Sequence, residues 1–141
     1  MKVATEEREF DSLRIGESAL VERTIRASDV QAFAEVSGDY SPLHMDDAYA
    51  TQSIFGQRVV HGGFLSSLVS QLVGMRLPGK YALLMRESLE FKKPMFIGDT
   101  IVVLGTIIAK SEATRVIELA IVVRRGEEVV ATGSVHASVL K

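Results

Sequence analysis

The sequence contains no cysteine and no tryptophan among its 141 residues. Without cysteine, disulfide bonds, metal sites built on thiolates and a cysteine nucleophile are excluded. The chain also lacks a strong charge of either sign, since 16 lysines and arginines stand against 18 aspartates and glutamates, for a net charge of −2. We therefore expect no nucleic-acid partner, because binding to a duplex depends on basic side chains that neutralise several phosphates.

Long hydrophobic runs are missing as well. The longest uncharged stretch, between Arg58 and Arg76, contains His61, three glycines, three serines and a glutamine. It is too short and too polar for a membrane span, so we expect no membrane association. Residues 1–10 are partly acidic and lack the apolar core of a signal peptide, which favours a cytoplasmic protein.

The composition is that of an ordinary globular protein, with 47% apolar and 24% charged residues. A chain of this length can bury one substantial core but is short for two domains. We see no internal repeat, linker or low-complexity segment in the sequence. Residues 1–141 are therefore predicted to form a single domain.

The first third of the chain shows one strand pattern and one helix pattern. Loose alternation of apolar and polar residues predicts a strand over 18–26. Ser28 stands where an N-cap is expected and Asp29 suits the first turn, so a helix is predicted from there to Gly38.

A turn follows this helix. Pro42 lacks a backbone N–H and restricts the residue before it, which predicts a fixed turn over 38–42. Asp46 can then cap a second short helix over 47–51.

A long helix is predicted from Gly62 onward. Its small residues recur at helical spacing, at Gly63, Ser67, Ser70 and Gly74. Its broad apolar face is formed by Phe64, Leu65, Leu68, Val69, Leu72, Val73 and Met75. An uncharged helix of this kind should be surrounded by other structure.

The second half of the chain changes to a strand pattern. A strand is predicted near 88–92, followed by three longer ones over 100–109, 115–124 and 129–140. Short turns between them imply an antiparallel meander. These strands are apolar on both faces, and one helix covers only one face, so a partner subunit could supply the remaining cover. The predicted fold class is α+β, with a long helix wrapped by an antiparallel sheet.

Asp39 and His44 lie on either side of the predicted turn, so both side chains could point into one space. Taken singly, an aspartate after glycine is most often a turn former, and a lone histidine is most often structural. A carboxylate and an imidazole beside one water can, however, divide the roles of general base and general acid. Both interpretations are open on spacing alone.

Gly62 and Gly63 open the long helix, whose unpaired N–H groups favour negative charge such as an oxyanion. Glycine also begins helices for steric reasons, so this role depends on the Asp39–His44 turn lying against the same helix end. For His61 we favour a structural hydrogen bond at the helix start.

Other polar side chains suggest no catalytic role. Ser70 is expected to bond a backbone carbonyl or line a cavity, and His136 to lie on a sheet face. Most basic side chains are expected to be solvated, although some could meet ligand phosphates; these are Arg58, Arg76, Lys80, Lys92, Lys93, Arg124 and Arg125.

Three stretches form a recognisable set of motifs: Ser37-Gly-Asp-Tyr-Ser-Pro-Leu-His-Met-Asp-Asp-Ala-Tyr-Ala50, Val60-His-Gly62, and Leu89-Glu-Phe-Lys-Lys-Pro94 with Gly98-Asp99. In these motifs the sequence resembles the MaoC-like, or (R)-specific, enoyl-CoA hydratases. The resemblance covers the chain from about Ser18 to the end. Ser41 is a departure, because the family commonly has asparagine there.

The resemblance implies a hot-dog fold, usually dimerised through the sheets, so a homodimer or higher homo-oligomer is expected. It also implies hydration of a trans-2-enoyl-CoA to the (R)-3-hydroxyacyl-CoA, or the reverse dehydration. The substrate would be an acyl-CoA or acyl-carrier-protein thioester, with no metal and no cofactor other than the CoA of the substrate.

The resemblance also assigns roles to residues. Asp39 and His44 would hold the attacking water, with Asp39 as general base and His44 passing a proton toward C2. Gly62 N–H would polarise the thioester carbonyl. Substrate-binding positions would be Ser70, Tyr40 and Leu65.

Two other functions are compatible with the same fold and the same polar residues. In a hot-dog thioesterase, a carboxylate would direct water at the thioester carbon. In a non-catalytic regulatory module, the groove would bind acyl-CoA without turnover, although the presence of both Asp39 and His44 argues against this.

Overall fold

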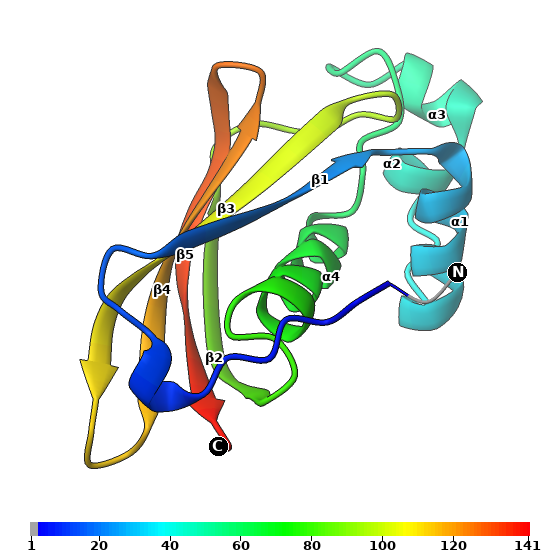
Figure 1. Cartoon of the computed structure of the whole chain (residues 1–141). Coiled ribbons are helices and arrows are strands. Elements are labelled where there is room, and N and C mark those ends of the chain that lie inside the picture. Colours follow the sequence, from blue (N-terminus) through cyan, green and yellow to red (C-terminus); the bar gives the residue numbers. More distant parts are fainter. Residues whose placement is uncertain (1–2) are drawn as a thin grey trace.

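The computed structural model describes residues 3–141, and its centre is a five-stranded antiparallel sheet in the order β1-β3-β4-β5-β2 (Figure 1). The predicted meander is confirmed, because three consecutive strands lie side by side. The strands are β1 (Ser18–Thr24), β2 (Ala82–Phe91), β3 (Thr100–Ser111), β4 (Val116–Arg125) and β5 (Glu128–Val139).

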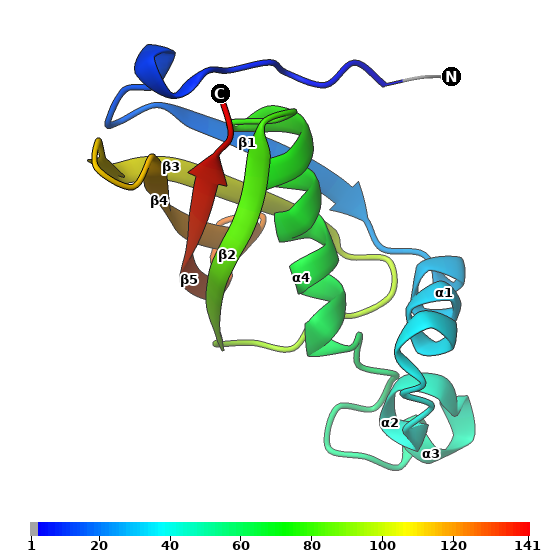
Figure 2. The same cartoon turned by 90° about the horizontal axis from the view of Figure 1, so that it is seen from below.

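The helices lie on one side of this sheet. Figure 2 shows α4 along one sheet face and the other three α-helices beside one end of α4. Within residues 3–141, no helix is long and apolar enough to cross a membrane. The helices are α1 (Ala27–Ser37), α2 (Pro42–Met45), α3 (Asp47–Thr51) and α4 (Gly62–Gln71), with a 3₁₀ turn at Phe10–Ser12 and a π-helical turn at Leu72–Arg76.

The core lies between α4 and the inner sheet face. Alternate residues of β3 and β4 point inward and are fully buried, as the period of a strand requires. A side chain on Gly105 would lie 2.7 Å from Leu72 Cδ2, so glycine lets the helix approach the sheet closely. The helix contributes the buried side chains of Phe64, Leu65, Leu68 and Val69.

The cap of α1 differs from the prediction. The helix begins at Ala27, so Ser28 lies inside the first turn and is not the N-cap. The carboxylate of Asp29 satisfies the helix start instead, since its Oδ2 accepts the Arg26 N–H at 2.9 Å. By contrast, Asp46 caps α3 as predicted, because its Oδ1 accepts the Tyr49 N–H at 3.0 Å.

Asp29 is also held by arginine side chains. Arg23 forms a bidentate ion pair with its carboxylate, and Arg26 Nη2 lies 3.4 Å from Oδ1. The Arg23 guanidinium is the main cause that lowers the pKa of Asp29 to about 2, against burial, which raises it. The start of α1 is thereby tied to β1.

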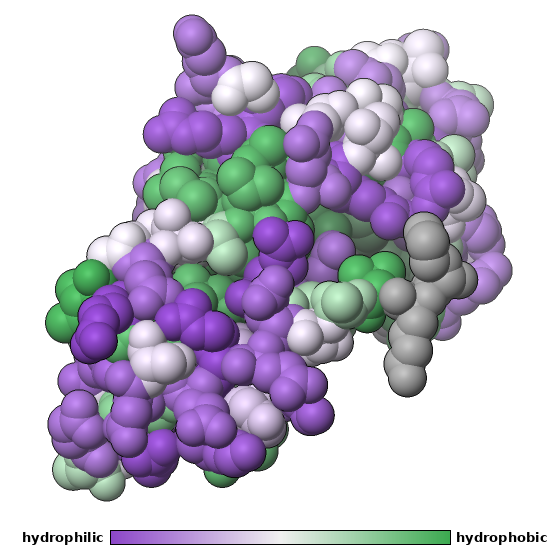
Figure 3. Space-filling model, viewed as in Figure 1, coloured by the Kyte–Doolittle hydropathy of each residue, from purple (hydrophilic) through white to green (hydrophobic). Residues whose placement is uncertain are grey.

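Two apolar or small-residue surfaces remain open in a single chain. On α4, Gly63, Ser67 and Ser70 are exposed, so the sheet covers one side of the helix and leaves this side uncovered in a single chain. Apolar side chains also gather over the outer sheet face (Figure 3). Leu20, Leu104 and Val122 are neighbours in register on that face and are partly or wholly exposed.

Candidate active site

The turn after α1 fixes Asp39. Gly38 adopts a left-handed conformation with φ of 77° and ends the helix by donating its N–H to Ala34 O at 2.9 Å. Asp39 Oδ1 then accepts the Ser41 N–H at 3.0 Å. The predicted turn is present, and its second carboxylate oxygen remains free for other contacts. The Asp39 side chain is 47% exposed in the single chain.

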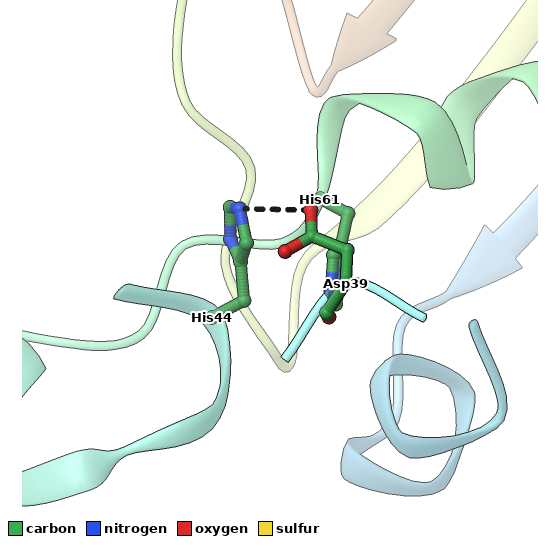
Figure 4. A group of neighbouring side chains, drawn as sticks. All are labelled: Asp39, His44 and His61. Atoms are coloured by element: carbon green, nitrogen blue, oxygen red, sulfur yellow. Dashed lines mark hydrogen bonds and ion pairs between the residues drawn. The ribbon is translucent and has the colours of Figure 1, made fainter. Parts of the chain in front are cut away.

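His44 lies on α2, which begins at Pro42. Its Nδ1 lies 2.6 Å from Val59 O, and because a carbonyl only accepts, Nδ1 must carry the hydrogen. His44 Nε2 therefore faces Asp39, with 4.0 Å between Nε2 and Oδ2 (Figure 4). The sequence prediction that the turn brings these two side chains together is confirmed.

His61 lies behind the pair and is 1% exposed. Its Nε2 lies 2.8 Å from the Asp39 carbonyl oxygen, which bears out the predicted structural hydrogen bond. Its ring also stacks on His44, with centroids 4.2 Å apart and planes inclined by 29°. The sequence pattern gave no sign of this stacking, because it depends on how two distant segments meet.

Asp39, His44 and His61 form a cluster whose ligand-type atoms lie within 4.8 Å of one another. A metal ion bound by both imidazoles would have to lie close to the plane of each ring, about 2 Å from a nitrogen. Rings stacked at 4.2 Å and inclined by only 29° do not direct their nitrogens at one such point. The geometry suits proton transfer better than metal binding.

The α4 N-terminus completes the polar part of the site. His61 is the residue before the helix, and Gly62 begins it and lines the same groove as His44. A Cβ on Gly62 would lie 3.2 Å from the Phe91 ring, so glycine admits this aromatic wall. The backbone N–H groups of a first helical turn lack intrahelical partners and favour developing negative charge.

The groove has a volume of about 350 Å³ and is mostly apolar. Two lysines, Lys92 and Lys93, lie along it. Its remaining lining is formed by Phe55, Val59, Val60, Phe91, Pro94 and Met95. Except for Val60 and the segment 89–94, which carry the family resemblance, these walls are not evident from the sequence, since apolar residues in loops resemble ordinary core residues.

An arginine braces the segment that forms one wall. Arg125 Nη1 donates to Pro94 O at 2.9 Å and lies 2.7 Å from Asp99 Oδ2, which also accepts the Phe96 N–H at 2.8 Å. Asp99 and Glu128, with which Arg125 is also paired, raise the pKa of Arg125. The expectation that this arginine is simply solvated is wrong.

Arg58 differs from expectation in the same way. Its side chain is only 15% exposed, and its Nε donates to the His44 carbonyl oxygen at 2.6 Å. The contact ties the Arg58 side chain to the backbone of α2 at His44. Two arginines that looked like surface charges therefore support the backbone around the groove.

The remaining predicted positions are more scattered. Tyr40 is exposed beside Asp39, whereas Leu65 is fully buried in the core and Ser70 is exposed near the end of α4. Their contact with substrate stays a prediction. His136 lies on the sheet as expected, with Nε2 3.4 Å from Glu118 Oε2.

Comparison with known proteins gives consistent matches. The family model described as MaoC like domain matches residues 13–132. The (R)-specific enoyl-CoA hydratase of Aeromonas caviae is 43% identical over 90 residues, covering 64% of this chain and 67% of the relative. The 3-hydroxybutyryl-CoA dehydratase of Methylorubrum extorquens is 34% identical over 132 residues, covering 94% and 84%.

Solved structures match equally well. The (R)-hydratase of A. caviae superposes with a TM-score of 0.87 at 35% identity, covering 91% of this chain and 98% of the other. The R-hydratase of Pseudomonas aeruginosa superposes with a TM-score of 0.92 at 28% identity, covering 97% and 88%. The predicted hot-dog fold is confirmed by these matches.

Proposed function

Because the chain belongs to the MaoC-like domain family, we propose that it catalyses the reversible hydration of a trans-2-enoyl-CoA to the (R)-3-hydroxyacyl-CoA. One geometric observation carries this proposal: the 4.0 Å gap between Asp39 Oδ2 and His44 Nε2. It is too long for a direct hydrogen bond, but a water about 2.8 Å from both atoms fits between them. The names of two sequence relatives, a hydratase and a dehydratase acting on CoA thioesters, support the same reaction.

In the proposed mechanism, Asp39 accepts a proton from this water while the water oxygen forms a bond to C3 of the enoyl group. The C2=C3 π electrons move toward the thioester, whose oxygen gains negative charge and is stabilised by the Gly62 N–H. His44 carries its own hydrogen on Nδ1, so its Nε2 takes up the proton from Asp39 and passes it on to C2. Water is thereby added across the double bond, and both groups are restored.

The groove walls would hold the acyl-CoA. Lys92 and Lys93 lie along the groove and can attract the negative charge of the CoA phosphates. We propose that the reaction needs no metal and no cofactor beyond the substrate's own CoA, because the stacked imidazoles are poorly placed to share an ion. Dialysis against a chelator should then leave the rate unchanged.

We further propose that the protein is a homodimer paired through β2. This strand is one edge of the sheet and exposes Leu83, Leu84 and Met85. An exposed apolar edge strand is an open template for pairing with a second chain. The groove lies at the end of the same strand, at Phe91, so a partner could cover the half-exposed Asp39 and exclude bulk water.

The function is tested by assaying hydration of trans-2-enoyl-CoA substrates of increasing chain length, with chiral analysis of the product. We expect loss of the enoyl absorbance and an (R)-3-hydroxyacyl product. An (S) product would contradict the family mechanism. Release of free CoA would indicate a thioesterase, and binding without turnover would indicate a regulatory module.

A further inference from the structure

His61 is buried at the site, yet the mechanism above assigns it no step. It contacts two other rings, with the Phe33 centroid at 4.8 Å and the His44 centroid at 4.2 Å. Its side chain bonds the main chain of Asp39, and its own residue is the N-cap of α4, directly before Gly62. One residue thus contacts or adjoins all three groups of the proposed reaction.

The hydrogen-bond pattern determines where the ring hydrogen of His61 lies. The Asp39 carbonyl oxygen can only accept, so the 2.8 Å contact requires a hydrogen on His61 Nε2. His61 Nδ1 is buried and has no hydrogen-bond partner among the described residues. A buried unpaired acceptor costs about 1–3 kcal/mol, so leucine or phenylalanine would pack here without this cost. We therefore look for the benefit of a histidine here in the two groups that it contacts, the Asp39 main chain and the His44 ring.

His61 and His44 are different imidazole tautomers, with the ring hydrogen on different nitrogens. His44 donates from Nδ1 to Val59 O, which leaves its Nε2 facing Asp39, whereas His61 donates from Nε2. The titratable or charged groups that contact the stacked pair are Asp39, on the His44 Nε2 side, and Arg58, which binds the His44 carbonyl, while Lys92 and Lys93 lie in the same groove. The Phe33 ring, which also contacts His61, is uncharged.

Asp39 needs such support because little else holds it. It follows the left-handed Gly38, belongs to no helix or strand, and has a half-exposed side chain. Its local contacts are with Ser37 Oγ and the Ser41 N–H, both within two residues along the chain. The bond from His61 is a long-range contact to its main chain, joining residues 22 positions apart.

We propose that His61 is a positioning residue for the hydration reaction, and this inference rests on the proposed function. Its Nε2–H fixes the Asp39 main chain relative to the α4 N-terminus, and its ring supports the flat side of His44. These two contacts fix the position of the Asp39–His44 gap relative to the Gly62 N–H. A displacement of about 1 Å in such a group can lower a rate by about 100-fold, so a modest hydrogen bond can have a large kinetic effect.

The test compares His61→Gln with His61→Met. The two side chains have similar size and shape, both lack the aromatic ring, and only glutamine can donate to Asp39 O. We expect His61→Met to lower kcat by about tenfold to 100-fold with KM changed less than about threefold. His61→Gln should recover kcat to within about fivefold of the unmodified protein. Equal kcat values for the two variants would overturn the proposal, as would a normal kcat for His61→Met.

His136→Gln is the matched control, because His136 lies on the sheet away from the groove and pairs with Glu118. Its kcat should stay within about twofold of the unmodified protein, as is usual for substitutions far from the reacting groups. Thermal unfolding of all variants shows whether any kinetic change follows from loss of the folded state.

A second measurement reports on the tautomers of the unmodified protein and does not depend on the activity of any variant. The sequence has three histidines, and nitrogen-15 NMR distinguishes imidazole tautomers, with each signal assigned from its loss in one His→Gln variant. We expect His61 in the Nε2–H form and His44 in the Nδ1–H form. A Nδ1–H form of His61 would overturn the proposal. If the unmodified protein shows the expected tautomers but hydrates no enoyl-CoA, the function has failed while the hydrogen-bond geometry stands.

Discussion

Asp39 Oδ2 and His44 Nε2 face each other across 4.0 Å, and the other polar atom of each side chain is hydrogen-bonded to a backbone group. Ser41 N–H binds the other oxygen of Asp39, and Val59 O binds the other nitrogen of His44. Both reactive atoms are therefore directed at the same gap. The spacing leaves room for one water and not for a direct contact between the two groups.

Removing either group should stop hydration while leaving the fold intact. Asp39→Asn keeps an oxygen for Ser41 N–H, and His44→Gln keeps a polar group near Val59 O. We expect each variant to lower kcat by about 10²–10⁴-fold, the usual contribution of general acid–base groups. Asp11→Asn, which removes an equal charge from an exposed turn, is the control. Near-normal rates in the first two variants would show that the pair is not catalytic.

The Gly62 N–H can be tested by a pair of substitutions. Gly62→Pro removes the N–H, and proline is tolerated in the first turn of a helix. Gly62→Ala keeps the N–H and adds the same Cβ, 3.2 Å from the Phe91 ring. We expect kcat for the proline variant to be about 10²–10³-fold below that for the alanine variant. Equal rates would mean that another group stabilises the oxyanion.

The Asp29 ion pair predicts a pH-dependent stability. Its pKa falls from 3.8 to about 2 in the folded protein, chiefly through Arg23. The ionised carboxylate therefore stabilises the fold by about 2 kcal/mol at neutral pH. This contribution is complete above pH 3.8 and is lost as the pH falls through about 2.

Urea unfolding of Asp29→Asn measures this effect. The variant should be less stable than the unmodified protein at pH 7, and the difference should shrink as the pH approaches 2. Asp11→Asn should change stability by less than about 0.5 kcal/mol at either pH. If the loss of stability in Asp29→Asn is the same at pH 7 and near pH 2, its cause is altered packing and not the lost charge.

Arg125 should affect substrate binding more than chemistry. Arg125→Met keeps the apolar stem but frees Pro94 O and Asp99, so the groove wall should become less ordered. We expect KM to rise about fivefold to tenfold with kcat within about threefold, because the reacting groups lie on other segments. Arg124→Met removes the same charge from the exposed neighbouring residue. If both variants raise KM equally, general attraction of the CoA phosphates explains the effect.

The edge strand predicts the oligomeric state. Met85→Lys places a charge on the exposed part of β2, a change that blocks edge-to-edge pairing. Light scattering after size exclusion should show a dimer for the unmodified protein and a monomer for the variant. Ile15→Lys, at an exposed apolar residue outside the strands, should remain dimeric. A dimeric Met85→Lys would place the interface elsewhere.

Much of the fold follows from local patterns in the sequence. Strand alternation, turn glycines and the uncharged run after Gly62 correctly indicated the meander and the helix packed against it. The Asp39 turn was also predictable, because Pro42 and Gly38 restrict the backbone there. The motif residues around these positions correctly identified the family.

The errors share one physical cause, which is contact between segments distant in sequence. Arg58 and Arg125 look like solvated charges because nothing nearby in the sequence shows that they bind His44 O and Pro94 O. By residue type Ser28 suits an N-cap, whereas in the structure Arg26 is the N-cap and donates its N–H to Asp29, which Arg23 of β1 also binds. The stacking of His61 on His44 is of the same kind.

The polar groups proposed to act on the substrate all come from residues 39–62, whereas Phe91, Met95 and the two lysines of the groove come from the sheet and its loop. The proton-transfer groups thus come from one part of the chain, whereas much of the groove wall comes from another. Substitutions between residues 91 and 95 can alter which acyl group fits without disturbing the proton-transfer pair. A single ancestral catalytic turn could in this way serve enzymes with different substrates through changes in a few wall residues.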